Sequence, residues 1–170
     1  MTSIGTSMPR RRKTDTPPVS PLPSAAAILT VLIAGAVASG LWEIWARAIT
    51  PLFIGGPLEA SALVKSSFGI NSSFLAETIH IVTGVIAYPL GYLLVARPLA
   101  KYFPISLPWP IVGAGFGVGL WVFAMYVMAH LVAGFPPFLG FGNLALASLY
   151  GHVLYGVAVA AIFRLRDADS

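Results

Sequence analysis

Two histidines lie inside strongly apolar segments, and each is followed four residues later by a glycine. His80 precedes Gly84, and His152 precedes Gly156. Residues four apart on a helix share a face, so each imidazole would have open space one turn away. Two imidazoles on neighbouring helices can hold a b-type haem from both sides, and a flat macrocycle needs such space. His80 and His152 are therefore candidate axial haem ligands, with Gly84 and Gly156 beside them.

Carboxylates near the same ends of the apolar segments suggest a second kind of site. Glu77 precedes His80 by three residues, so both lie on one helix face. At 1.5 Å per residue, five ionisable side chains lie roughly 6–13 Å from one edge of their segments. They could hold a divalent metal together: Glu43, Glu77, His80, His130 and His152. A ferritin-like di-iron site is disfavoured, because it needs Glu-x-x-His on two helices and the chain has one.

Each of these residues also has a purely structural interpretation. Glu77 lies in the first turn of its helix, where the helix dipole favours a carboxylate. Glu43 can pair with Arg47 at i, i+4. His130 can reach interfacial water. An interhelical hydrogen bond that holds the bundle together would account for His80 and His152.

Other known types of functional site are not indicated by the sequence. The chain has no cysteine, which excludes disulfides, cysteine-ligated zinc, iron–sulfur clusters and covalently attached haem. No nucleophile, base and electrophile are arranged for catalysis. The glycine-rich stretch 113–119 lacks the dinucleotide-binding spacing, and its G-x-x-x-G pairs predict close helix packing instead. We therefore expect a protein that is not an enzyme.

The composition predicts that these side chains are positioned by helices that cross a membrane. Of the 170 residues, 57% are apolar and 9% are charged, and the mean hydropathy is +0.84. A soluble domain carries about 25% charged residues. Four apolar spans, long enough to cross roughly 30 Å of hydrocarbon, lie at about 25–48, 74–96, 110–133 and 144–163. The predicted fold is an all-α, four-helix membrane bundle over residues 25–166.

The remaining segments are predicted to lie outside the bilayer. Residues 1–24 are basic and proline-rich, which is typical of a disordered tail. Residues 51–73 form an outer loop, in which 58–68 has the pattern of a short interfacial helix. With the N-terminus inside, Lys and Arg lie mainly on the inner side, so both termini should be cytoplasmic. This distribution also explains the pI of 9.7 without nucleic-acid binding. Cleavage of the first span as a signal peptide is the alternative.

The two halves of the chain share a pattern. Gly40-Leu-Trp42 in the first span matches Gly119-Leu-Trp121 in the third, and the two His-x-x-x-Gly motifs occur in the second and fourth. The second and fourth spans run in the same direction. The pattern therefore predicts two like helical hairpins forming a parallel repeat, with His80 and His152 at similar depth.

These motifs, together with the "PLFIGGPLEASALVKSSFGI" segment, resemble small uncharacterised four-helix inner-membrane proteins of bacteria. The resemblance implies the architecture and a bacterial inner-membrane location, and it implies no activity. Three functions remain open. The first is a non-enzymatic membrane protein, such as an accessory subunit of a larger membrane complex, with an outer-side His/Glu cluster. The second is a redox protein that binds haem b or a metal. The third is a small homo-oligomeric permease or proton channel.

Overall fold

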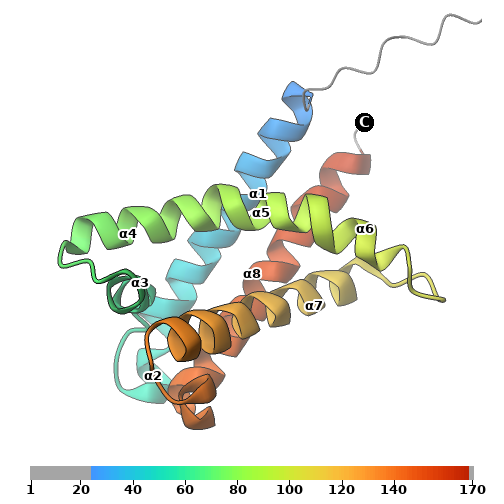
Figure 1. Ribbon diagram of the computed structural model, residues 1–170. Helices are drawn as coiled ribbons and strands as arrows, with labels where there is room; N and C mark the ends of the chain where they lie inside the picture. The colour runs from blue at the N-terminus through green and yellow to red at the C-terminus, as the bar shows by residue number, and fades with distance from the viewer. Residues whose placement is uncertain (1–23, 169–170) are drawn as a thin grey trace, which may run out of the picture.

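The computed structural model describes residues 24–168, and within this part of the chain all regular structure is helical. Four helices are long and apolar enough to cross a membrane: Ala25–Ile54, Ser73–Ala100, Trp109–Val132 and Asn143–Asp167. The predicted all-α bundle is therefore confirmed (Figure 1). The tail predicted over 1–24 lies outside the described residues except at Ser24, whose side chain accepts a hydrogen bond from the Ala27 N–H and caps the first helix.

The four spans are built from shorter helical segments. The first comprises α1 (Ala25–Ile44), the π-helical η1 (Trp45–Ile49) and α2 (Pro51–Ile54). The second comprises α4 (Ser73–Val82), η2 (Thr83–Ala87), α5 (Tyr88–Gly91), η3 (Tyr92–Ala96) and α6 (Arg97–Ala100). The third comprises α7 (Trp109–Val122) and the π-helical η4 (Phe123–Val132), and the fourth is α8 (Asn143–Ala168). Between the spans lie α3 (Ala60–Phe68) and the 3₁₀ turn η5 (Pro137–Phe141).

Proline explains three of the π-helical segments. Pro51, Pro89 and Pro98 each stand two residues after the end of such a segment. A proline has no N–H and its ring clashes with the carbonyl of the preceding turn. In all three cases the residue just before the proline donates its N–H to the carbonyl five residues back, as Tyr88 does to Thr83. The wider turn gives the proline ring room, so the helix continues through Pro89 with α5 and η3.

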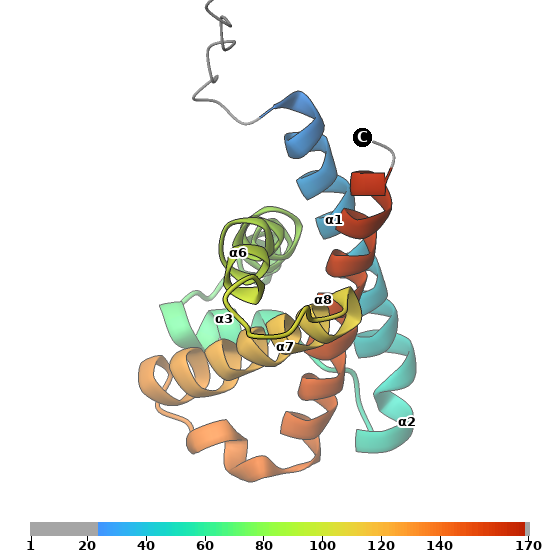
Figure 2. The ribbon, with the colours of Figure 1, turned by 90° about the vertical axis from the view of Figure 1, so that its right-hand side faces the viewer.

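Helices α1 and α8 form an antiparallel pair in the core of the bundle and lie side by side (Figure 2). Trp45 Nε1 donates to the Ala147 carbonyl at 2.9 Å, near one end of the pair. Near the other end, Arg166 Nε donates to Thr30 Oγ1 at 2.8 Å. Gly151 lies directly against the Trp45 and Trp42 rings, because a Cβ there would overlap them. A small residue therefore lets two large indoles pack on α8.

Glycines also set the contact between α7 and α8. A Cβ on Gly117 would lie 2.7 Å from the Val153 Cα, and one on Gly113 would lie 2.8 Å from the Gly156 carbonyl oxygen. Backbone therefore packs on backbone, as small-residue patterns predict for membrane helices. On the opposite side of α7, Gly115 has no neighbour within 4 Å of such a Cβ.

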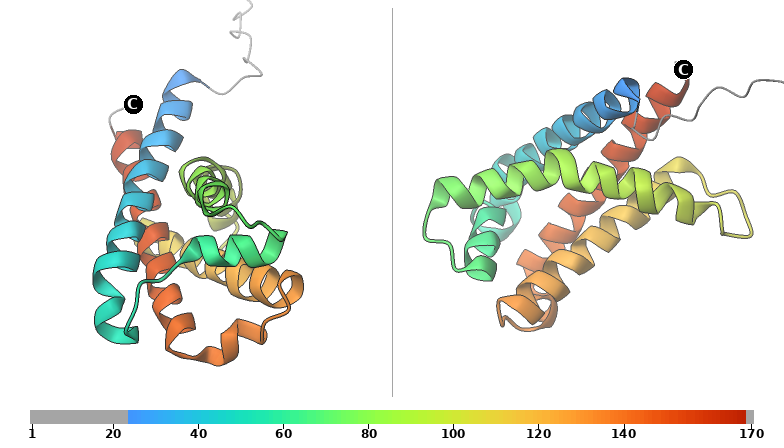
Figure 3. Two further views of the ribbon diagram at one scale, coloured as in Figure 1. Left: turned by 90° about the vertical axis from the view of Figure 1, so that its left-hand side faces the viewer. Right: turned by 45° about the horizontal axis from the view of Figure 1, so that its top comes forward.

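The second span crosses the other helices at a steep angle, and α3 lies at the same end of the molecule as α4 and η4 (Figure 3). Helix α3 contacts both α4 and η4. The helix predicted for the outer loop over 58–68 is thus present as α3, and it bridges the second and third spans at this end.

The loop before α8 has an unusual backbone conformation. Phe138, Leu139 and Gly140 have positive φ values of 50°, 51° and 68°, forming a short left-handed turn. Such a conformation is costly for residues other than glycine. The Phe138 ring stacks on Trp121, with ring centroids 4.8 Å apart. This aromatic packing offsets part of the backbone cost.

Candidate functional site

A cavity of about 610 Å³ lies beneath α3 at the end of the bundle where the second and third spans are bridged. Its walls come from α1, α3, α4, η2, η4 and α8. Most of the lining is aliphatic or aromatic, including Phe123, Met125 and Met128. The polar side chains on its walls include Ser39, Ser67, His80, Thr83, Tyr88, Ser148, His152 and Tyr155. An apolar cavity with a few convergent polar groups is the usual form of a small-molecule site.

His152 is the more buried of the two histidines on the cavity wall. Its side chain is 8% exposed, and Nδ1 lies 2.8 Å from the Ser148 carbonyl oxygen. A carbonyl oxygen only accepts hydrogen bonds, so Nδ1 carries the proton. In the neutral imidazole, Nε2 then has a free lone pair. His152 therefore brings a hydrogen-bond acceptor, or a metal ligand, to the cavity.

Trp42 links the two histidines of the predicted haem site. Its ring centroid is 4.7 Å from that of His152 and 6.4 Å from that of His80. All three side chains line the cavity. The structure thus brings His80 and His152 together around one indole. The Trp42 side chain is only 5% exposed.

The two predicted spacer glycines have different surroundings. Gly84 lines the cavity, and its carbonyl accepts a hydrogen bond from the Tyr155 hydroxyl. A Cβ on Gly84 would lie 2.7 Å from Ser39 Oγ, so this glycine mainly allows α1 to approach. Gly156 packs on the backbone of α7. The space beside His152 predicted at Gly156 is thus filled by a helix.

Ser39 carries the only buried side-chain N or O atom in the described chain that has no hydrogen-bond partner. This atom is the hydroxyl oxygen Oγ. Ser39 lines the cavity together with Gly84 and Tyr155. Buried polar atoms are nearly always hydrogen-bonded, and an exception calls for an explanation. No group of the described residues supplies a partner for this hydroxyl.

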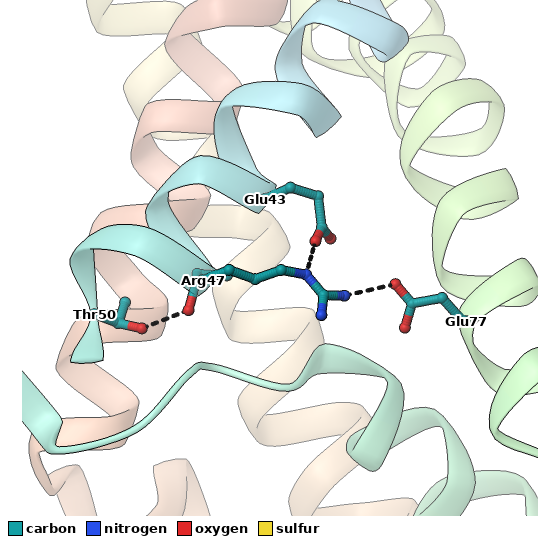
Figure 4. Close-up of polar contacts among 5 residues, drawn as sticks. Glu43, Arg47, Thr50 and Glu77 are labelled. Carbon is teal, nitrogen blue, oxygen red and sulfur yellow. Dashed lines mark hydrogen bonds and ion pairs between the residues drawn. The ribbon is translucent and has the colours of Figure 1, made fainter.

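The predicted carboxylates form an ion-pair network of their own, drawn in Figure 4. Arg47 contacts Glu43 on its own helix, and its Nη2 lies 3.1 Å from Glu77 Oε1 on α4. The Glu43–Arg47 pair expected from i, i+4 spacing is therefore present. The bridge to Glu77 fastens the first span to the second.

A second, smaller pocket lies next to this network. It has a volume of about 220 Å³ and is lined by Glu43, Arg47, Lys65, Glu77 and His80, among others. His80 lines both pockets. The residues shared by the polar pocket and the apolar cavity are Leu58, Glu59, Ala60, Ala62 and His80.

The five residues of the predicted metal site are not gathered at one point. Among residues 24–168, no group of three or more His, Asp or Glu side chains is placed to hold a metal ion. Glu43 and Glu77 are engaged by Arg47. His130 lies apart from both pockets, with Nδ1 2.7 Å from the Phe135 carbonyl oxygen.

The sequence interpretation missed several cavity residues, among them Ser39, Trp42 and Tyr155. Each lies in a span that is apolar on all sides, so hydrophobic periodicity gives no indication of the face that turns inward. The one available signal was the duplicated Gly-Leu-Trp element, which pairs Trp42 with the buried Trp121.

Comparison of the chain with protein-family models, with curated proteins and with solved structures finds no match. The structure shows an all-α protein with four candidate membrane spans. The function is therefore inferred from the size of the cavity and from the residues that line it.

Proposed function

We propose that this protein is a non-enzymatic multi-pass membrane protein that binds a lipophilic small molecule in the cavity beneath α3. The observation that carries the proposal is the cavity: about 610 Å³, mostly apolar, and lined from four spans and α3. A cavity of this size matches the 300–1,000 Å³ of typical ligand pockets. Its position within membrane-spanning helices favours a ligand that partitions into lipid.

The construction of the cavity wall supports a binding role. Segment η4, which contributes Met125 and Met128 to the wall, is π-helical, and no proline follows it closely as in the other three π-helical segments. π-Helical turns inside helices are frequent at functional sites. Methionine side chains adapt to ligands of irregular shape, because they are flexible and polarisable.

A heavy-atom quencher of tryptophan fluorescence tests this proposal. With purified protein in detergent, 1-bromodecane should produce saturable quenching, because Trp42 lines the cavity. The saturable part should disappear in Trp42→Phe. It should weaken in Thr83→Phe, which places a larger side chain in the cavity.

Trp109→Phe is the matched control, since Trp109 does not line the cavity and its side chain is 40% exposed. This variant should keep the saturable component. Quenching that rises linearly with probe in every variant would show partition into detergent alone, and would refute the proposed binding site.

The proposed setting is the bacterial inner membrane, with both termini cytoplasmic and the cavity near the outer side. The ends of α1 and α8 support a shared side for the termini, because Thr30 and Arg166 are hydrogen-bonded there. Arg97 and Asp167 form an ion pair at the same end, with Nη2 and Oδ2 2.7 Å apart. The protein is proposed to form a homo-oligomer or to be an accessory subunit of a larger membrane complex.

Haem b binding is a second candidate, favoured by the presence of His80 and His152 on one cavity wall. The hydrogen bond from His152 Nδ1 to a carbonyl is typical of imidazoles that ligate metals. Protein purified from haem-replete cells should then show a Soret band that is lost in His80→Ala and in His152→Ala. This result would establish haem as the ligand, in place of the proposed lipophilic small molecule. A colourless preparation would eliminate this candidate.

A further inference from the structure

We infer that the ligand of the cavity is an aromatic ring carrying a hydroxyl group and an apolar tail, as in a membrane hydroquinone. This inference rests on the proposed function and specifies the ligand class. It follows from three features of the wall: the acceptor at His152, the unpartnered hydroxyl of Ser39, and the surrounding aromatic and thioether side chains.

The imidazole of His152 selects for a hydrogen-bond donor on the ligand. Because Nδ1 donates to the Ser148 carbonyl at 2.8 Å, Nε2 of the neutral ring accepts. A hydroxyl can donate to Nε2, whereas a quinone carbonyl cannot. A ketone or ester would leave the lone pair unsatisfied, which is costly in a buried place. The site should therefore distinguish a hydroquinone from its own oxidised form.

Ser39 provides a second hydrogen-bonding position. Its Oγ is buried and has no partner in the described chain. A serine hydroxyl both donates and accepts, so it can bond the oxygen of a ligand hydroxyl. Ser39 lies on α1, as does Trp42, and Trp42 is in ring contact with His152. The hydroxyl and the imidazole thus lie on two packed helices that face one cavity.

The remaining lining favours a flat ring over a saturated chain. Trp42, Tyr88, Phe123 and Tyr155 supply aromatic faces and edges, which pair with other rings at centroid separations of 4.5–7 Å. Met125 and Met128 add thioethers, which make favourable contacts with aromatic rings. An apolar tail would be covered by α3, where Leu63 and Phe68 line the cavity.

The experiment compares probes that differ in one chemical feature. Full-length protein in lipid nanodiscs is equilibrated without oxygen with decylubiquinol, decylubiquinone, the dimethyl ether of decylubiquinol, or 1-dodecanol. Bound probe is quantified by chromatography, with empty nanodiscs as the partition blank. Decylubiquinol should bind about tenfold more tightly than the quinone or the ether, because each lacks the donor that His152 accepts from. 1-Dodecanol, which has a hydroxyl and no ring, should bind more weakly than decylubiquinol.

Substitutions of His152 and Ser39 test whether these two side chains cause the tighter binding of decylubiquinol. His152→Leu should abolish the preference for decylubiquinol over the quinone, whereas His130→Leu, outside the cavity, should retain it. Ser39→Ala should weaken decylubiquinol binding several-fold. Ser66→Ala should not, because Ser66 Oγ already donates to the Ala62 carbonyl.

Separate outcomes contradict the inference and the proposed function. Equal binding of hydroquinone and quinone to the wild-type protein would overturn the donor requirement, and this comparison needs no variant. Binding of 1-dodecanol as tight as that of decylubiquinol would overturn the aromatic requirement. In both cases a lipophile-binding cavity would remain. Absence of binding by all four probes, together with absence of saturable bromodecane quenching, would refute the proposed function itself.

Discussion

The Trp42 indole meets the His152 imidazole edge-on, with ring centroids 4.7 Å apart and planes at 69°. Both side chains are more than nine-tenths buried, Trp42 at 5% and His152 at 8% exposure. The edge-to-face contact fixes the plane of the imidazole. The hydrogen bond from Nδ1 to the Ser148 carbonyl leaves Nε2 as the nitrogen that can accept a hydrogen bond. The acceptor in the cavity is therefore held by packing from α1 and hydrogen bonding within α8.

Close packing of α7 on α8 predicts that glycine is required at position 117. In Gly117→Ala, the new methyl group would overlap Val153 Cα and the His152 backbone. The two helices must move apart, which should reduce the free energy of unfolding by about 1–3 kcal/mol. Thermal unfolding in detergent, followed by circular dichroism, measures the change.

Gly115→Ala is the matched control, because a Cβ there has no neighbour within 4 Å. This variant should be neutral or up to about 1 kcal/mol more stable, since alanine favours helix. Equal destabilisation by both substitutions would show that α7 and α8 do not pack through Gly117.

The hydrogen bond from Tyr155 to the Gly84 carbonyl predicts a specific cost for losing the hydroxyl. Tyr155→Phe keeps the ring and leaves a buried carbonyl without this donor, so stability should fall by about 0.5–1.5 kcal/mol. Tyr150→Phe is the control, because Tyr150 is 63% exposed. Unfolding of the two variants under identical detergent conditions provides the comparison, and indistinguishable midpoints would contradict the contact.

The network around Arg47 should contribute little to stability. The side chains of Arg47, Glu43 and Glu77 are 61%, 35% and 31% exposed, and exposed ion pairs are screened by water and salt. A double-mutant cycle of Arg47→Gln and Glu77→Gln should give a coupling energy below about 1 kcal/mol. The coupling should shrink further at high ionic strength. A coupling of several kcal/mol that is insensitive to salt would mean that the network is shielded from solvent.

The membrane architecture could be predicted from the sequence because it depends on composition and segment length. Apolar runs of about 20 residues leave a helix as the only way to satisfy the backbone in lipid. Local relationships were also accessible: the i, i+4 pair of Glu43 with Arg47 is present, and Gly113-x-x-x-Gly117 is the close-packing face of α7. The overlapping Gly115-x-x-x-Gly119 pair, equally regular in sequence, faces away from neighbours.

The cavity could not be predicted because it arises from the crossing of helices. The second span packs on α1 through Gly84 and Ser39, and α3 fills the end between α4 and η4. Neither relationship is encoded in local spacing. The bridge from Arg47 to Glu77 joins residues 30 apart in the chain. The His-x-x-x-Gly motifs did identify two residues of the cavity wall, although Gly156 serves helix packing.

The orientation of the bundle leads to a topology prediction. The positive-inside rule predicts that both termini lie in the cytoplasm and that the α3 segment lies outside. A periplasm-active reporter such as alkaline phosphatase should therefore be active when fused after Ser61 and inactive when fused after Ser170. A cytoplasm-active reporter at the same two positions should give the reverse pattern and serves as the control for expression. Activity of the periplasmic reporter only after Ser170 would invert the orientation, and would place the cavity and the Arg47 network on the cytoplasmic side.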